Sequence, residues 1–280
     1  MKDSIEKIHD INLEILKEVD RIARNNNINY FIESGTLLGA VRHKGFIPWD
    51  DDIDLLVKRE DIDKFISVCE KELDSKYKIV KPNEFNGHFF DFVPRIVVES
   101  SRLREETEED IFYGNNQNRV ALDIFILDST SSNKIFQKIK AIELKIIYGL
   151  AMGHRFKIDY SKYSLLNKIY VAFLAFVGRR IKLKSIFKWQ SKVAKKYNKS
   201  DSEYCMVSNY ILREIGLVFR KKWYDSYEYK RFENTELRCP VGWDNILRRL
   251  YGNYMELPPE HERVYAHMDE EGFLDGSESS

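Results

Sequence analysis

Four aspartates lie within five residues of this chain: Asp50, Asp51, Asp52 and Asp54. Carboxylates this close repel one another, by about 4 kcal/mol for two charges 4 Å apart at an effective dielectric near 20. A hard divalent cation offsets that repulsion, because carboxylate oxygens are the ligands it prefers. The cluster therefore favours a cation site, and a solvated acidic loop is the alternative.

Strand parity divides these aspartates into two groups. Residues 52–57 read as a strand, and alternation along it places Asp52 and Asp54 on one face and Ile53 on the other. Asp51 then falls on the core side with Ile53 and is least expected to take part in chemistry. Asp50 is expected to help on the phosphate side of the site.

A fifth carboxylate, Asp123, stands alone in the apolar stretch 120–127, which reads as another strand. Burying it is costly unless it is paired or bound to a metal. We expect Asp123 to complete a Mg²⁺ site with Asp52 and Asp54, with Mn²⁺ as the alternative ion. For Asp123 alone, a buried salt bridge remains open.

Gly35 and Thr36 form a turn between a short strand, 28–32, and a short helix, 36–42, capped by Ser34 or Thr36. Backbone N–H groups at a helix start bind phosphate oxygens, and the Thr36 hydroxyl can add to them. The turn is therefore a candidate phosphate site.

Three cations are further candidates for phosphate contacts. Arg42 and Lys44 lie between the turn and the aspartates, and Arg95 lies in the predicted strand 89–98. An ordinary surface ion pair is the alternative for Arg95.

The rest of the pattern indicates alternating helices and strands. We expect an amphipathic helix over the first 25 residues, a helix over 60–73, strands over 77–80 and 232–239, and a helix over 244–251 ended by Gly252.

The middle of the chain is basic although the formal net charge is zero. Residues 131–200 hold 17 Lys and Arg against Glu143 and Asp159, a net charge of +15. Lysines from Lys184 to Lys199 recur along one helix face, and the apolar run 169–177 is far shorter than the ~20 residues that cross a bilayer. The segment suits the anionic inner leaflet of a membrane, or a solvated helix face over the core. Nucleic acid is not expected, because no binding motif accompanies the charge.

Three widely spaced cysteines, Cys69, Cys205 and Cys239, form no metal or disulfide pattern, and the first residues carry charges where an export signal needs an apolar stretch. We expect a reducing cytoplasmic location, peripheral to the inner face of the cell membrane.

The segment 35–54, from Gly35-Thr36 through Pro48-Trp49 to Asp54, resembles the signature of the LicD family. Residues 122–125 and 251–260 are similar to two later motifs of that family. The resemblance implies a nucleotidyltransferase-like α+β fold, a mixed sheet flanked by helices, with its catalytic core over 1–130. A basic helical region over 131–200, a C-terminal segment over 201–268 that completes the site, and a disordered acidic tail over 269–280 are expected to follow.

The family resemblance further implies transfer of a phospho-alcohol, most simply phosphocholine from CDP-choline, to a sugar of a lipid-linked surface glycan such as teichoic acid, capsule or lipopolysaccharide. Asp52, Asp54 and Asp123 would be catalytic and hold the metal. Trp49 and Tyr254 are candidates for binding the quaternary ammonium, with packing as the alternative. A nucleotidyltransferase that releases pyrophosphate and a non-catalytic glycan-assembly protein are the other functions considered.

Overall fold

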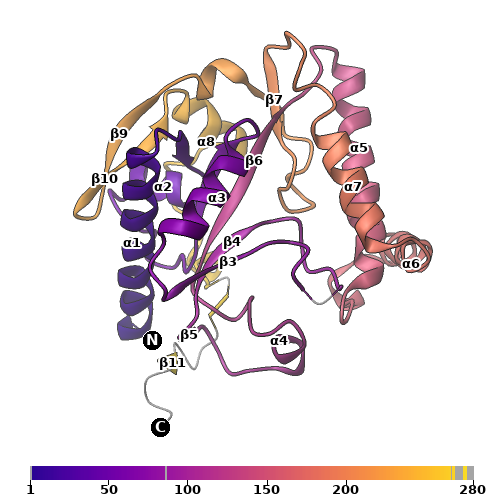
Figure 1. Ribbon diagram of the computed structural model, residues 1–280, viewed down its shortest axis with the longest axis horizontal. Helices are drawn as coiled ribbons and strands as arrows, with labels where there is room; N and C mark the ends of the chain where they lie inside the picture. Colours follow the sequence, from indigo (N-terminus) through magenta and orange to yellow (C-terminus); the bar gives the residue numbers. More distant parts are fainter. Residues whose placement is uncertain (1, 86, 266, 269–273, 276–280) are drawn as a thin grey trace.

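A seven-stranded mixed sheet forms the centre of the molecule (Figure 1). The computed structural model describes residues 2–85, 87–265, 267–268 and 274–275. Five strands follow the order β1-β2-β6-β4-β3, with bounds Tyr30–Ile32, Ile53–Lys58, Ala121–Ser129, Arg95–Val98 and Tyr77–Val80. The β2–β6 pair is parallel and the other pairs are antiparallel. The predicted α+β fold, a mixed sheet flanked by helices, is confirmed.

Strand β6 is the long central strand, and two partners share one of its edges. Its first residues pair with β4, and its last residues pair with β7 (Tyr204–Val207), which in turn pairs with β8 (Phe219–Arg220). Because β6 is apolar from Ile124 to Leu127 and buried there, it anchors the core. The carboxylate at its start, Asp123, lies outside that apolar stretch.

Three helices from the N-terminal part of the chain contact the sheet: α1 (Lys2–Asn25), α2 (Ser34–Arg42) and α3 (Ile62–Glu72). Figure 1 shows α1 and α3 side by side over the sheet. The apolar stripe of α1, including Ile8, Ile15, Val19 and Ile22, is fully buried. The amphipathic pattern therefore covers one sheet face as predicted.

The start of α2 differs from the prediction. Its N-cap is Glu33, and that side chain makes no capping hydrogen bond. Ser34 adopts a left-handed backbone conformation (φ 46°), and the Thr36 hydroxyl accepts a hydrogen bond from a neighbouring strand instead. Capping of α2 by Ser34 or Thr36 was therefore wrong, because tertiary contacts use that hydroxyl.

Four helices follow β5 (Ser101–Arg102): the short α4 (Glu108–Phe112), then α5 (Lys134–Ala151), α6 (Leu165–Gly178) and α7 (Leu183–Ala194). Figure 1 shows α5, α6 and α7 grouped together, apart from α1 to α3. Short 3₁₀ turns occur at Met152–His154, Tyr160–Lys162, Lys221–Tyr224 and Glu260–Glu262.

The C-terminal segment contains a hairpin, β9 (Tyr227–Phe232) and β10 (Thr235–Pro240), followed by α8 (Trp243–Tyr251). The single strand predicted over 232–239 is thus two strands, joined at Glu233 in a left-handed conformation. The strand predicted over 89–98 is shorter, beginning at Arg95. Of the predicted tail, Leu274–Asp275 form β11 on β5, and the rest, 269–273 and 276–280, lies outside the described residues.

Candidate active site

Three charged residues stand in one row across the sheet. In the parallel β2–β6 pair Asp54 lies opposite Asp123, and in the antiparallel β4–β6 pair Arg95 lies opposite the same Asp123. Directly opposed residues on neighbouring strands project from the same face. Residues separated by 28 and 69 positions in sequence are therefore assembled by strand register alone.

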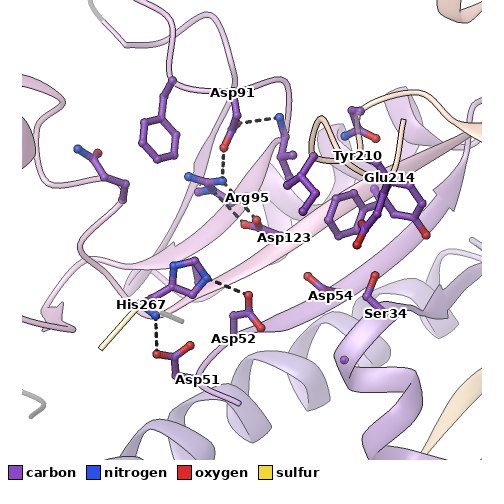
Figure 2. A pocket seen from close by; sticks show the side chains of 18 of the residues that line it. Ser34, Asp51, Asp52, Asp54, Asp91, Arg95, Asp123, Tyr210, Glu214 and His267 are labelled. Carbon is purple, nitrogen blue, oxygen red and sulfur yellow. Dashed lines mark hydrogen bonds and ion pairs between the residues drawn. The ribbon is translucent and has the colours of Figure 1, made fainter. Parts of the chain in front are cut away.

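This row lines a cavity of about 470 Å³. Figure 2 shows the Asp52 and Asp54 carboxylates facing the Arg95–Asp123 pair across it. The rest of the lining comes from the segment before β4, the loop 116–119, α5 and the residues after it, and the segment 209–214. It includes Asp91, Arg119, Tyr148, Arg155, Tyr210 and Glu214.

The connection from α2 to β2 holds the aspartates in place. Thr36 Oγ1 accepts a hydrogen bond of 2.9 Å from the backbone N–H of Asp54, and Thr36 is buried. The Asp50 carboxylate lies directly against Gly35, where a Cβ atom would collide with it. Glycine at position 35 therefore lets Asp50 approach the start of α2.

The aspartates strongly perturb one another. Burial, followed by the charge of Asp52, raises the pKa of Asp50 to about 8. Burial, followed by the charges of Asp52 and Asp123, raises the pKa of Asp54 well above its ordinary value. These two carboxyls thus favour the protonated form in the absence of a compensating cation.

His267 supplies a cation to Asp52. Burial alone would raise the Asp52 pKa, but the hydrogen bond and charge of His267, 3.0 Å away, outweigh it and lower that pKa. Conversely, burial acts to lower the pKa of His267, and Asp52 raises it to about 9. Asp52 and His267 therefore form an ion pair at the cavity.

Asp51 fixes the segment that carries this histidine. Its Oδ2 accepts hydrogen bonds from the backbone N–H groups of His267 and Met268, at 2.8 and 2.6 Å. The Asp51 side chain is buried, and Figure 2 shows it beside the His267 backbone, whereas Asp52 contacts the imidazole ring. The Asp51 contacts position the C-terminal segment against the site.

Arg95 joins two carboxylates. Its Nε donates to Asp123 Oδ1 at 3.0 Å, and its terminal nitrogen donates to Asp91 Oδ2 at 2.7 Å. Burial raises the pKa of Asp123, and Arg95 opposes that effect. Arg95 also donates to Asp123 Oδ2 at 3.3 Å, and the Asp123 side chain, 25% exposed against 8% for Arg95, lines the cavity.

Comparison with known proteins matches residues 27–145 to the family described as LicD/FKTN/FKRP, nucleotidyltransferase domain. That range contains α2, β2, β4 and β6, and so the whole row from Asp54 to Arg95. This domain belongs to the LicD family.

Two curated proteins show how far the similarity extends. The protein named lipopolysaccharide cholinephosphotransferase LicD, from Haemophilus influenzae, is 26% identical over 269 residues, which cover 92% of this chain and 94% of that protein. Ribitol 5-phosphate transferase FKRP of Homo sapiens is 51% identical over 35 residues, 12% of this chain and 7% of that protein. Similarity to the bacterial LicD protein thus extends over most of this chain, and similarity to FKRP is confined to a short segment.

The donor chemistry of this LicD-family site suits a hard cation, although its predicted ligands have other partners. Within the described ranges no three His, Cys, Asp or Glu side chains are close enough together to hold a metal ion. Asp52 contacts His267 and Asp123 contacts Arg95, which separates them. Burial and neighbouring carboxylates nevertheless raise the pKa of Asp50 and Asp54, so a bound cation would favour their ionised forms, and carboxylate oxygens are the ligands that Mg²⁺ prefers.

Five predicted residues lie outside the cavity, and one of them, Thr36, uses its hydroxyl to accept a hydrogen bond from the Asp54 N–H. Arg42 donates to the backbone carbonyls of Tyr254 and Glu256, at 2.9 and 3.3 Å. Arg42, Trp49 and Tyr254 line an adjoining hollow of about 580 Å³, which shares Gly35, Asp50 and Tyr251 with the cavity. Lys44 lines neither hollow, and its Nζ donates to the Val41 carbonyl at 3.0 Å.

Several residues at the cavity escaped the sequence analysis. His267 belongs to no metal-ligand spacing in the sequence, yet it contacts an aspartate 215 positions away. Arg119 and Arg155 add positive charge on the wall that also holds Arg95. Because no local motif marks these residues, only the folded chain brings them to the site.

Proposed function

We propose that this protein transfers phosphocholine from CDP-choline to a sugar hydroxyl of a cell-surface glycan precursor, such as teichoic acid, capsule or lipopolysaccharide. The observation that carries the proposal is the register of Asp54, Asp123 and Arg95 in one cavity, which places carboxylates beside cations. The name of the Haemophilus relative, similar over 92% of this chain, supports phosphocholine as the group.

The cavity has the two kinds of wall that a CDP-alcohol requires. One wall holds Asp50, Asp52 and Asp54, and the other holds Arg95, Arg119 and Arg155. Arginine recognises phosphate through several N–H donors, so we assign the diphosphate to the arginine wall. Arg119 lines the cavity, and its Nη1 lies 3.8 Å from Glu99 without a hydrogen bond in the described residues.

Mg²⁺, or Mn²⁺, is the proposed cofactor, with Asp52, Asp54 and Asp123 as its ligands. When bound, it supplies electrostatic stabilisation of phosphate charge and orientation of the diphosphate. Binding would require Asp52 and Asp123 to turn part of their carboxylate edges from His267 and Arg95. The cation would in turn relieve the repulsion among Asp50, Asp52 and Asp54, which favours such binding.

The transfer itself assigns roles to the chain's own groups. The acceptor hydroxyl oxygen forms a bond to the phosphorus bearing choline, and the bond from that phosphorus to the CMP oxygen breaks. We assign removal of the hydroxyl proton to Asp54, because its carboxylate lines the cavity beside the proposed metal site. Arg95 stabilises charge on the departing CMP phosphate.

Recognition of choline calls for aromatic faces and negative charge. Tyr251 lies where the cavity and the adjoining hollow meet, and Glu214 lines the cavity nearby. Trp49 and Tyr254 line the adjoining hollow alone. We place the trimethylammonium at this junction, with Tyr251 and Glu214 in contact with it.

The test is product analysis with Mg²⁺, a lipopolysaccharide acceptor and, in separate reactions, CDP-choline, CDP-glycerol, CDP-ribitol and CTP. Release of CMP with phosphocholine appearing on the glycan supports the proposal. Release of pyrophosphate from CTP with a nucleotide on the acceptor would show nucleotidyl transfer instead. A folded protein that neither binds nor turns over any donor would indicate a non-catalytic role.

A further inference from the structure

Helix α6 is apolar on nearly all sides, yet the fold covers only half of it. Between residues 163 and 178 the sequence contains a single charged residue, Lys168. Helices that are hydrophobic all round are normally buried in a protein core or a membrane. One side of α6 therefore lacks the cover that its composition calls for.

The covered side of α6 is held rigidly against the end of α5. Val171, Leu174, Ala175 and Gly178 are buried. Gly178 packs directly on the backbone of Leu150, and a Cβ atom there would collide with it. The helix axis is thus fixed by close backbone contact, so its opposite side presents a defined surface.

The other side of α6, which we call the exposed α6 face, carries six large apolar side chains. Leu166 is 80% exposed and Leu165 is 74% exposed, so most of each side chain has no contact with the fold. Successive members are one or three residues apart and so lie along one side of the helix. They are Leu165, Leu166, Ile169, Tyr170, Phe173 and Phe176.

Basic residues flank the exposed α6 face. Arg180, Lys182 and Lys184 follow the helix and are exposed, and Lys157 is exposed before it. The surrounding region 131–200 carries a net charge of +15. An apolar helix face bordered by Lys and Arg is complementary to the acyl boundary and head groups of an anionic lipid leaflet.

We propose that the exposed α6 face docks this protein on an anionic lipid surface, the inner leaflet of the cell membrane. The 14 residues of α6 extend about 21 Å at 1.5 Å per residue, which fits a helix lying in the interface. Nowhere in the described chain is there a helix both long and apolar enough to span a bilayer. Docking is therefore peripheral.

The docking helix adjoins the candidate active site. Tyr148 of α5 lines the cavity, and the next residue, Gly149, packs against Leu174 of α6. Arg155, just beyond α5, lines the cavity as well. On the proposed function, which this step of the inference rests on, docking brings the cavity close to a glycan acceptor anchored in lipid.

Flotation with vesicles tests docking without any substrate. The intact protein is mixed with vesicles of phosphatidylglycerol and phosphatidylcholine, or of phosphatidylcholine alone. We expect the wild type to float with the anionic vesicles. The affinity of the triple variant L165Q/I169Q/F173Q for these vesicles should be lower by about tenfold or more, because buried apolar area sets interfacial affinity. The matched control I111Q alters an exposed isoleucine on α4, 61% exposed, and should bind like the wild type.

The charge contribution is tested with K182E/K184E, and K71E/K222E is the control with the same change in net charge at other exposed positions. Weaker anionic-vesicle binding in the first pair alone supports the proposal. Unchanged flotation of the α6 triple variant would overturn the proposal. It would also be overturned if the wild type bound no vesicles and were a dimer in light scattering that the triple substitution converts to a monomer. CMP release from CDP-choline, measured separately, reports on the catalytic proposal.

Discussion

Arg95 lies directly opposite Asp123 on adjacent antiparallel strands, with its Nε 3.0 Å from Oδ1 of that aspartate. The same guanidinium reaches Asp91, so one cation holds two carboxylates at the cavity wall. Since Asp123 is also opposite Asp54, Arg95 sits one strand beyond a carboxylate pair. Positive and negative charge thus meet where the diphosphate and its cation are proposed to bind.

Replacing Asp54 or Asp123 by Asn should reduce turnover by about 100-fold or more, because each change removes a proposed metal ligand and the first also removes the proposed base. CMP release from CDP-choline with Mg²⁺ measures this, and circular dichroism confirms folding. The exposed Asp63→Asn serves as the control. Near-normal turnover in folded D54N would disprove the assignment of Asp54.

Arg95→Met should lower the free energy of unfolding by about 3 kcal/mol, because it leaves two carboxylates without their cation in a largely buried place. Urea unfolding measures the change. Adding Asp123→Asn to the same chain should recover part of the loss, since it removes one unpaired charge. If the double variant loses the sum of the two single effects, the pair is not coupled.

Thr36→Val should lower kcat by roughly tenfold or more and destabilise the fold by about 1–3 kcal/mol, because the Asp54 N–H loses its acceptor and the strand end shifts. Thr36→Ser keeps the hydroxyl and should restore both properties. Steady-state kinetics and thermal unfolding provide the measurements. A normal Val variant together with an impaired Ser variant would show that the methyl group, rather than the hydroxyl, matters.

Ionisation of the buried Glu33 carboxyl should lower the free energy of unfolding as pH rises. Glu33 is fully buried, and that burial raises its pKa from 4.5 to about 7, against the opposing hydrogen bond from Tyr210. A folded-state pKa above the unfolded value means that the folded protein binds more protons between the two. The contribution of Glu33 is therefore full below pH 4.5 and lost as pH rises through about 7, a total of about 3 kcal/mol at 1.36 kcal/mol per unit.

Urea unfolding from pH 4.5 to 8 tests this, with wild type and Glu33→Gln compared at each pH. Gln has no titration, so the stability difference between the two proteins should change with pH by the amount that Glu33 contributes. Glu14→Gln on the exposed side of α1 is the control. Parallel curves for wild type and E33Q would show that Glu33 titrates normally in the folded state.

Local pattern was sufficient for much of the site. The two-residue period of a strand put Asp52 and Asp54 on the same side, and the apolar stretch around Asp123 marked that carboxylate as needing a partner. Among the described residues, β3 at Tyr77–Val80 and the end of α8 at Gly252 also match their predictions. Such features depend on a few consecutive residues, which is why they are legible in the sequence.

Local pattern failed wherever a long-range contact decided the outcome. Ile135, Ile139 and Ile142 form an apolar stripe, yet they are exposed on α5 while Lys140 is buried, with its Nζ donating to the carbonyls of Ser129 and Ala194. Arg42 fits a phosphate ligand by position, but it holds the backbone after α8. Periodicity defines the faces of a helix and not which face the rest of the chain covers.

The sequence by itself determined which carboxylates share a strand face and which segment concentrates positive charge, because both follow from neighbouring residues. Tertiary structure decided that Asp54, Asp123 and Arg95 stand in register, that His267 returns to Asp52 from 215 positions away, and that half of α6 stays uncovered. Strand register and helix burial are set by the summed packing of distant segments. No short stretch of sequence therefore determines the register or the burial.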